Sequence, residues 1–102
     1  AQTPEVPYYA VIFTSVLAED DSGYEQMAQK MVQLAEQQAG FIGIEGAREG
    51  LGITVSYWQD LESIKKWKNA TEHQIAQKYG KEKWYAQYSV RVAKVERQYG
   101  QF

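Results

Sequence analysis

The segment YYAVIFTSVL, residues 8–17, constrains the fold more than any other part of the sequence. Aromatic and β-branched residues dominate it, and its composition and length are typical of a β-strand. Side chains alternate between the two faces of a strand, yet both faces are apolar here. One face carries Tyr9, Val11 and Phe13, and the other carries Tyr8, Ala10 and Ile12. Such a strand needs cover on both sides, so helices on one face of a sheet cannot be its only neighbours.

A helix is predicted next, in SGYEQMAQKMVQLAEQQAG (residues 22–40). Ser22 and Glu25 have the spacing of an N-terminal capping box, in which each side chain bonds to the backbone N–H of the other residue. Gly40 is predicted to end the helix. The apolar residues recur every three or four positions and therefore share one helical face: Tyr24, Met27, Ala28, Met31, Leu34 and Ala35.

A hairpin and a second helix follow. FIGIEGAR (41–48) and LGITVSYW (51–58) read as two strands joined by a short connection at Glu49–Gly50. Asp60 has the character of an N-cap residue. Helical spacing then continues through Leu61, Ile64 and Trp67.

The stretch after Trp67 predicts a break and a new helix. Thr71 and Gln74 repeat the capping-box spacing, so the helix is expected to break near residues 69–71. A short new helix would then run to about Tyr79 and end at Gly80.

The predicted element order gives the fold class. YAQYSVRVAKVERQY (85–99) reads as the last strand, which completes the order β-α-β-β-α-β. This is the ferredoxin-like α+β arrangement, with one antiparallel sheet and helices on one face. Residues 1–102 are interpreted as a single domain, of which 1–7 form an N-terminal extension. The simplest cover for the other sheet face is a second copy, so we expect a homodimer through that face.

Composition excludes several classes of function. The sequence has no cysteine, which excludes thiolate chemistry, and a zinc site with one histidine would need an unusual set of carboxylates. The net charge of −2 gives no footprint for nucleic acid, and no apolar run reaches the ~18 residues of a membrane span. AQTPEVP (1–7) lacks a charged-then-apolar signal segment. We therefore expect a cytoplasmic protein without metal, membrane or nucleic-acid partners.

Three stretches resemble a known family: GFIGIEGAREGLGITVSYWQDLESIKKWK (40–68), His73 with Ala76, and WYAQYSVRVAKVERQY (84–99). In these stretches and in element order, the sequence is similar to antibiotic-biosynthesis-monooxygenase-like (ABM) domains of the dimeric α/β-barrel superfamily. The resemblance implies a homodimer with a barrel of two sheets and a pocket between sheet and helices in each subunit. Some relatives oxidise polycyclic aromatic molecules with dioxygen and no metal or flavin, others bind and degrade haem, and many small bacterial members have no assigned role.

The haem branch of this family can be compared residue by residue. Its members have an Asn on the first strand, a Trp on the second helix and a His about one helical turn beyond His73. Here Trp67 matches the Trp, but the polar residues of the first strand are Thr14 and Ser15. Gln77 stands near the position of the histidine, and it is not a usual axial ligand of haem. The pattern therefore disfavours haem degradation.

The branch that needs no cofactor requires a dry aromatic pocket, a proton acceptor and a cation. His73 is the candidate acceptor because its ordinary pKa lies near physiological pH. Arg91, in the middle of the last strand, is the candidate cation for an oxyanion. The residues predicted to line a pocket for a small aromatic ligand are Tyr57, Trp58, Trp67, Trp84 and Tyr85.

Each candidate also has a purely structural interpretation. His73 fits the exposed rim of a helix, and the spacing of Trp67 fits core packing. Trp84 and Tyr85 could clamp a hinge or contact a second subunit. Arg91 could pair with an acid such as Glu45 on a neighbouring strand, whereas Tyr57 and Trp58 point to opposite faces. A small-molecule-binding dimer without turnover is therefore the alternative to a monooxygenase.

Overall fold

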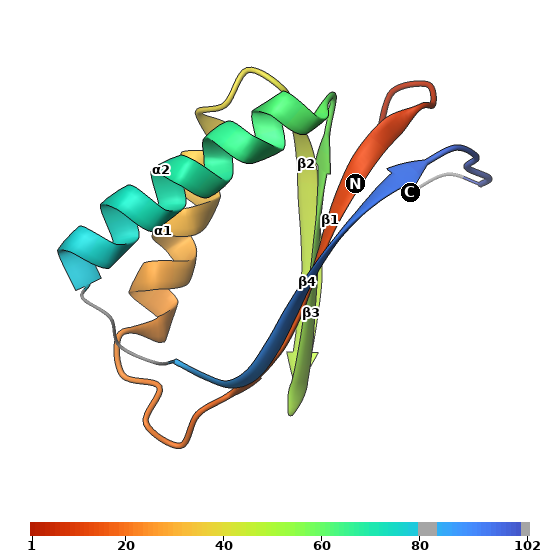
Figure 1. Ribbon diagram of the computed structural model, residues 1–102. Coiled ribbons are helices and arrows are strands. Elements are labelled where there is room, and N and C mark those ends of the chain that lie inside the picture. The colour runs from red at the N-terminus through yellow and green to blue at the C-terminus, as the bar shows by residue number, and fades with distance from the viewer. Residues whose placement is uncertain (80–83, 101–102) are drawn as a thin grey trace.

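The computed structural model describes the backbone of residues 1–79 and 84–100, and the side chains of residues 1–74 and 84–100. It confirms the ferredoxin-like order β-α-β-β-α-β (Figure 1). The elements are β1 (Tyr8–Leu17), α1 (Tyr24–Glu36), β2 (Phe41–Glu49), β3 (Leu51–Trp58), α2 (Leu61–Tyr79) and β4 (Tyr85–Val95).

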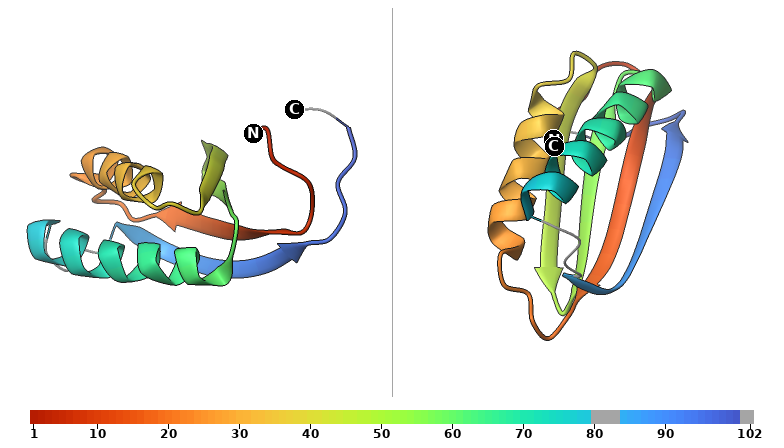
Figure 2. Two further views of the ribbon diagram at one scale, coloured as in Figure 1. Left: turned by 90° about the horizontal axis from the view of Figure 1, so that it is seen from above. Right: turned by 60° about the vertical axis from the view of Figure 1, so that its left-hand side comes forward.

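The four strands form one antiparallel sheet in the order β2-β3-β1-β4, and both helices lie on one face of it (Figures 1 and 2). The hairpin prediction is confirmed, because Glu49 pairs with Leu51 and Gly50 makes the turn at φ 75°. Val11 of β1 packs against the helices, and it pairs with Ser56 of β3 and Val92 of β4. Residues that pair directly share a face, so this register tells which strand residues face the helices.

The start and end of α1 differ from the prediction. The helix begins at Tyr24 after Gly23, and Gly23 offers no side-chain cap. Ser22 instead bonds to the carboxylate of Asp20 through its backbone N–H and its hydroxyl, so the predicted capping box is wrong. At the other end α1 stops at Glu36, four residues before Gly40.

Gly40 has a different role from the predicted helix stop. A Cβ atom at this position would overlap the Cβ and Oγ atoms of Ser63, at the start of α2. The carbonyl of Gly40 also accepts a hydrogen bond from the backbone N–H of Gln59 at 2.8 Å. The missing side chain therefore allows the beginning of β2 to lie close to the beginning of α2.

The second helix is a single helix, and the predicted break is wrong. Asp60 caps it as expected, because its carboxylate accepts a hydrogen bond from the Ser63 N–H at 2.7 Å. The helix then continues through residues 69–71 to Tyr79, and the pair of Lys68 with Glu72 spans the expected break. Residues 61–79 contain no glycine or proline, so nothing forces the backbone to leave the helix there. Gly80, the predicted end, lies outside the described residues.

The core lies between the helices and the sheet and consists of two clusters that share Trp67. Trp58 of β3 is fully buried, and its ring lies 5.0 Å from that of Trp67, at an angle of 30°. The Trp67 indole N–H donates to the carbonyl of Met31 on α1 at 3.1 Å. Trp67 thus connects both helices to the sheet. The clusters contain Val11, Ala35, Trp58 and Ile64 in one, and Met27, Leu34 and Trp84 in the other.

The face of the sheet away from the helices, called the outer face below, is covered in part by the ends of the chain. Strand β4 ends at Val95 instead of the predicted residue 99, and Gln98 turns back toward the N-terminal residues. The Tyr8 hydroxyl donates to the Gln98 side chain at 2.8 Å, and the Thr3 hydroxyl donates to the same oxygen at 2.8 Å. Toward the hairpin, Leu51 and Ile53 remain 52% and 44% exposed.

No helix in the described part of the chain is long and apolar enough to cross a membrane.

Candidate functional site

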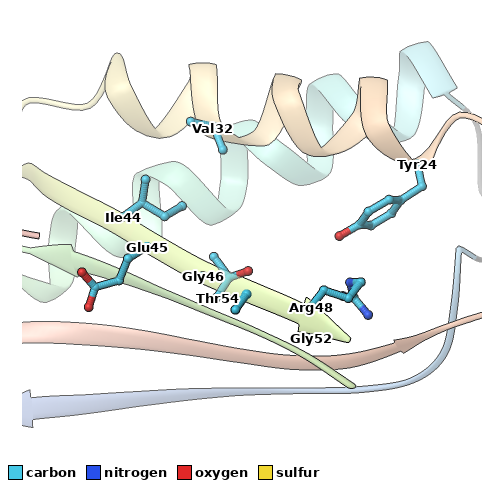
Figure 3. Close-up of a pocket in the computed structure, with 9 residues that line it drawn as sticks. Tyr24, Val32, Ile44, Glu45, Gly46, Arg48, Gly52 and Thr54 are labelled. Carbon is cyan, nitrogen blue, oxygen red and sulfur yellow. The ribbon is translucent and has the colours of Figure 1, made fainter. Parts of the chain in front are cut away.

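An open cleft of about 440 Å³ lies between α1 and the β2–β3 hairpin. Helix α1 forms one wall, and the helix-facing side of the hairpin forms the other (Figure 3). Its size is within the range of small-molecule sites. The lining residues are Tyr24 and Val32 of α1, Ile44, Glu45, Gly46, Ala47 and Arg48 of β2, and Gly52 and Thr54 of β3.

Arg48 spans three strands on the helix-facing side of the sheet. It starts on β2, opposite Gly52 of β3, which in turn is opposite Ser15 of β1. The guanidinium donates to the carbonyl of Ser15 at 3.1 Å and also bonds to the Ser15 hydroxyl. A Cβ atom at Gly52 would collide with this guanidinium. The glycine therefore gives Arg48 a path across β3, and buried Ser15 fixes its far end.

Two tyrosines lie beside Arg48. The guanidinium carbon is 5.6 Å from the centre of the Tyr24 ring, a cation–π distance. The Tyr24 ring in turn meets Tyr85 of β4 edge to face, with centroids 5.8 Å apart. Burial, and next the neighbouring Tyr24 phenol, raise the pKa of Tyr85 well above its ordinary value, although Arg48 acts in the opposite direction. Tyr85 therefore remains a protonated phenol at neutral pH, and its hydroxyl keeps a proton that it can donate in a hydrogen bond.

No acid within the described residues neutralises the charge of Arg48. Among residues 1–74 and 84–100, no carboxylate forms an ion pair with it. Glu45 contributes to the cleft wall, but its carboxylate points away from α1 (Figure 3). That carboxylate accepts a hydrogen bond from the Tyr57 hydroxyl at 2.7 Å on the outer face. The cleft therefore presents a cation, phenol groups and the Thr54 hydroxyl, which together suit an anionic or oxygen-rich ligand.

The structure does not bring the two predicted catalytic residues together. His73 is exposed on α2, on the helical side of the sheet. Arg91 pairs with Ile12, so it lies on the outer face, where its guanidinium donates to the Ser89 hydroxyl at 2.8 Å. The suggested partner Glu45 is bonded elsewhere. Within one chain, the sheet separates Arg91 from the helices.

The five aromatic residues predicted to line one pocket lie in different parts of the structure. Trp58 and Trp67 belong to the core, and their indole N–H groups are bonded within the chain. Trp84 is buried, with its N–H donated to the carbonyl of Ser22 at 3.0 Å. Tyr57 lies on the outer face with Glu45. Tyr85 meets Tyr24 edge to face and so lies beside the cleft.

Sequence reasoning missed Arg48, Tyr24 and Ser15. A signal for Arg48 was present, because a hairpin with its turn at Gly50 places Arg48 directly opposite Gly52. An arginine that faces a bare glycine across a hairpin has room to lie flat over the neighbouring strand. Ser15 gave no such signal, since only the pairing of β1 with β3 brings it into this row.

A metal centre is not evident in the described part of the chain, where no three His, Cys, Asp or Glu residues gather around one point. The donors around the cleft instead stabilise negative charge. A preorganised guanidinium and phenols act most strongly on charge that develops during a reaction.

The sequence pattern of the antibiotic biosynthesis monooxygenase family matches residues 7–79. The uncharacterized protein YqjZ of Bacillus subtilis (strain 168) is 55% identical over 100 residues, which cover 96% of this chain and 88% of that protein. A mutant of SnoaB, a cofactor-independent oxygenase from Streptomyces nogalater, has a similar fold, with a TM-score of 0.72 at 10% identity over 92% of this chain and 97% of that one. MhuD, in a mutant with two manganese protoporphyrin IX molecules bound per active site, gives a TM-score of 0.67 at 15% identity over 90% and 98% of the two chains.

The Tyr57 phenol provides a test of the contacts on the outer face. Burial, and then the hydrogen bond to Glu45, raise the pKa of Tyr57 from 10.0 to about 12. Because the folded state holds this proton more tightly than the unfolded state, the stabilisation is complete below pH 10 and is lost as the pH rises through 12. NMR titration of ring-labelled tyrosine should show one phenol with a midpoint near 12 that is absent in Tyr57→Phe and lower in Glu45→Gln. An unchanged midpoint in Glu45→Gln would show that the carboxylate does not cause the shift.

Proposed function

The chain belongs to the antibiotic biosynthesis monooxygenase family, and on that basis we propose that it is a cofactor-independent monooxygenase acting on a small aromatic or quinone-like molecule. The observation that carries the proposal is the guanidinium of Arg48 beside Tyr24 in an open cleft, where no acid of residues 1–74 or 84–100 pairs with it. The similar fold of an oxygenase that is itself cofactor-independent supports it.

The proposed reaction uses the substrate as its own reductant. A bound hydroquinone loses a phenolic proton to solvent water, and the anion passes one electron to dioxygen. The substrate radical and superoxide then combine into a C–O bond at a ring carbon. Loss of the ring proton with cleavage of the O–O bond leaves a carbonyl, and the departing oxygen becomes water. One hydroquinone and one dioxygen thus give one hydroxyquinone and one water.

In this proposal Arg48 stabilises the phenolate, and the stabilisation lowers the energy needed to ionise the bound phenol. Ser15 positions the guanidinium through its carbonyl and hydroxyl. Tyr24 and Tyr85 form an aromatic edge beside the guanidinium. The assignment of His73 as proton acceptor and of Arg91 as the cation for the oxyanion stays a prediction. Arg91 lies on the outer face, so this role requires that the ligand binds on that side of the sheet.

A small-molecule-binding protein without turnover is the second candidate. It is favoured by the side chains of the cleft, because those in the described residues include no His, Asp or Glu that points inward as a general base (Figure 3). A binding protein needs only the cation and the aromatic wall.

Oxygen consumption with a panel of hydroquinones distinguishes these two functions. The wild type is expected to consume dioxygen in proportion to the hydroxyquinone formed. Arg48→Gln should lower kcat/KM by about 10²–10³, the usual loss when one preorganised oxyanion donor is removed. Arg97→Gln, which removes an exposed arginine after β4, is the matched control and should leave the rate unchanged.

The same assay tests the residues predicted from the sequence. A large loss of rate in His73→Ala would support its role as base, and equal rates would remove it from the mechanism. If Arg48→Gln and the wild type consume dioxygen equally fast, the reaction does not use the cleft. If no hydroquinone is turned over, the binding function is favoured.

We also propose that the chain forms a homodimer through its outer face. The ends of the chain cover that face around Tyr8, while Leu51 and Ile53 stay exposed near the hairpin. A second copy that packs on the outer face would bury these exposed apolar side chains.

Light scattering after gel filtration tests the dimer. The wild type should have twice the chain mass of 11.7 kDa, and Ile53→Glu should raise the dimer dissociation constant at least about tenfold, because a charge would be buried in the interface. Leu61→Glu is the control, since Leu61 is 54% exposed at the start of α2 on the helical side. A monomeric wild type, or an equally strong effect of both variants, would contradict this interface.

A further inference from the structure

We infer that the ligand of the cleft is an aromatic carboxylate, with its carboxylate bound to Arg48 and its ring against Tyr24. The inference rests on the proposed function in one respect, since it takes the cleft as the site of the ligand. It goes further in naming a charged group that the ligand carries before any reaction begins.

The charge of Arg48 is not balanced by the residues that it bonds to. A guanidinium has five N–H donors, and within the described residues its hydrogen bonds reach only Ser15, which is neutral. The two acids of β2, Glu45 and Glu49, do not neutralise this charge, because their side chains lie on the outer face. They pair there with Val55 and Leu51 of β3. Within the described residues, Arg48 thus keeps a net positive charge and free donors at the cleft wall.

A carboxylate and a phenol differ in their charge at physiological pH. A free phenol has a pKa of about 10 and arrives neutral at physiological pH, whereas an aromatic carboxylate arrives charged. A planar guanidinium also matches two carboxylate oxygens better than one phenolic oxygen. An arginine that has no ion pair with the described part of the chain therefore favours a ligand that is already anionic.

The apolar residues of the cleft indicate what the rest of the ligand is. Val32 and Ile44 face each other across the cleft, and the Tyr24 ring closes the end near Arg48 (Figure 3). Such a surface suits a flat apolar ring that extends from the anionic group. A ring with a hydroxyl next to its carboxylate would present both oxygens to the same guanidinium. Hydroxylated aromatic acids are therefore the substrate class that joins this inference to the proposed reaction.

Calorimetric titration at pH 7.5 tests the charge preference with ligands of one shape. The probes are 2-naphthoate, the neutral 2-naphthamide, and 2-naphthol as the phenol. The wild type should bind 2-naphthoate at least about tenfold more tightly than either neutral probe, as expected for a charge-assisted contact. Arg48→Gln should bind all three alike, Arg48→Lys should keep part of the preference, and Arg97→Gln should keep all of it.

Two results would overturn the inference. One is equal affinity of the wild type for 2-naphthoate and 2-naphthamide, or tighter binding of 2-naphthol, and this comparison needs no variant to fold. The other is a preference for 2-naphthoate that survives in folded Arg48→Gln, which would place the anion elsewhere. Binding is measured without turnover, so a charge preference without oxygen consumption would uphold this inference and contradict only the monooxygenase.

Discussion

The stacked indoles of Trp58 and Trp67 hold the helices against the sheet, and the rest of the structure depends on that contact. Trp58 comes from β3, an inner strand of the sheet, and is fully buried, while Trp67 belongs to α2 and donates to the carbonyl of Met31 on α1. Large aromatic rings contribute much of the apolar area that a small core can bury. With the helices fixed in this way, α1 leaves an open cleft over the hairpin.

The chemistry of the cleft follows from a row of three residues across the sheet. Arg48 can lie flat because Gly52 has no side chain, and it is held there because Ser15 accepts its hydrogen bonds. The guanidinium is thus positioned before any ligand arrives, which is the condition under which a fixed charge contributes most to binding or catalysis. Glu45 of the same strand points to the other face of the sheet, where it accepts a hydrogen bond from Tyr57, so it is not a counterion for Arg48.

The strands, both helices and their order could be predicted from the sequence, because apolar periodicity and the turn at Gly50 report local structure. The errors occurred where a local motif competed with tertiary contacts. Thr71 and Gln74 have capping-box spacing inside a continuous helix, and Gly40 resembles a helix stop but serves a close contact with Ser63. The site was harder to predict, since large aromatic residues such as Trp67 mark cores as readily as pockets. The row of Arg48, Gly52 and Ser15 depends on pairing between strands distant in sequence.

The central claim is that the ligand binds between α1 and the hairpin, on the charge of Arg48. NMR titration of the ¹⁵N-labelled protein with 2-naphthoate tests it most directly, because it reports the place of binding without requiring a reaction. The account predicts that the signals of the Arg48 side chain and of the Gly46 and Gly52 amides shift together and saturate, while those of Arg91 and Ala93 on the outer face stay in place. Shifts centred on Arg91, with those of the cleft unchanged, would contradict it.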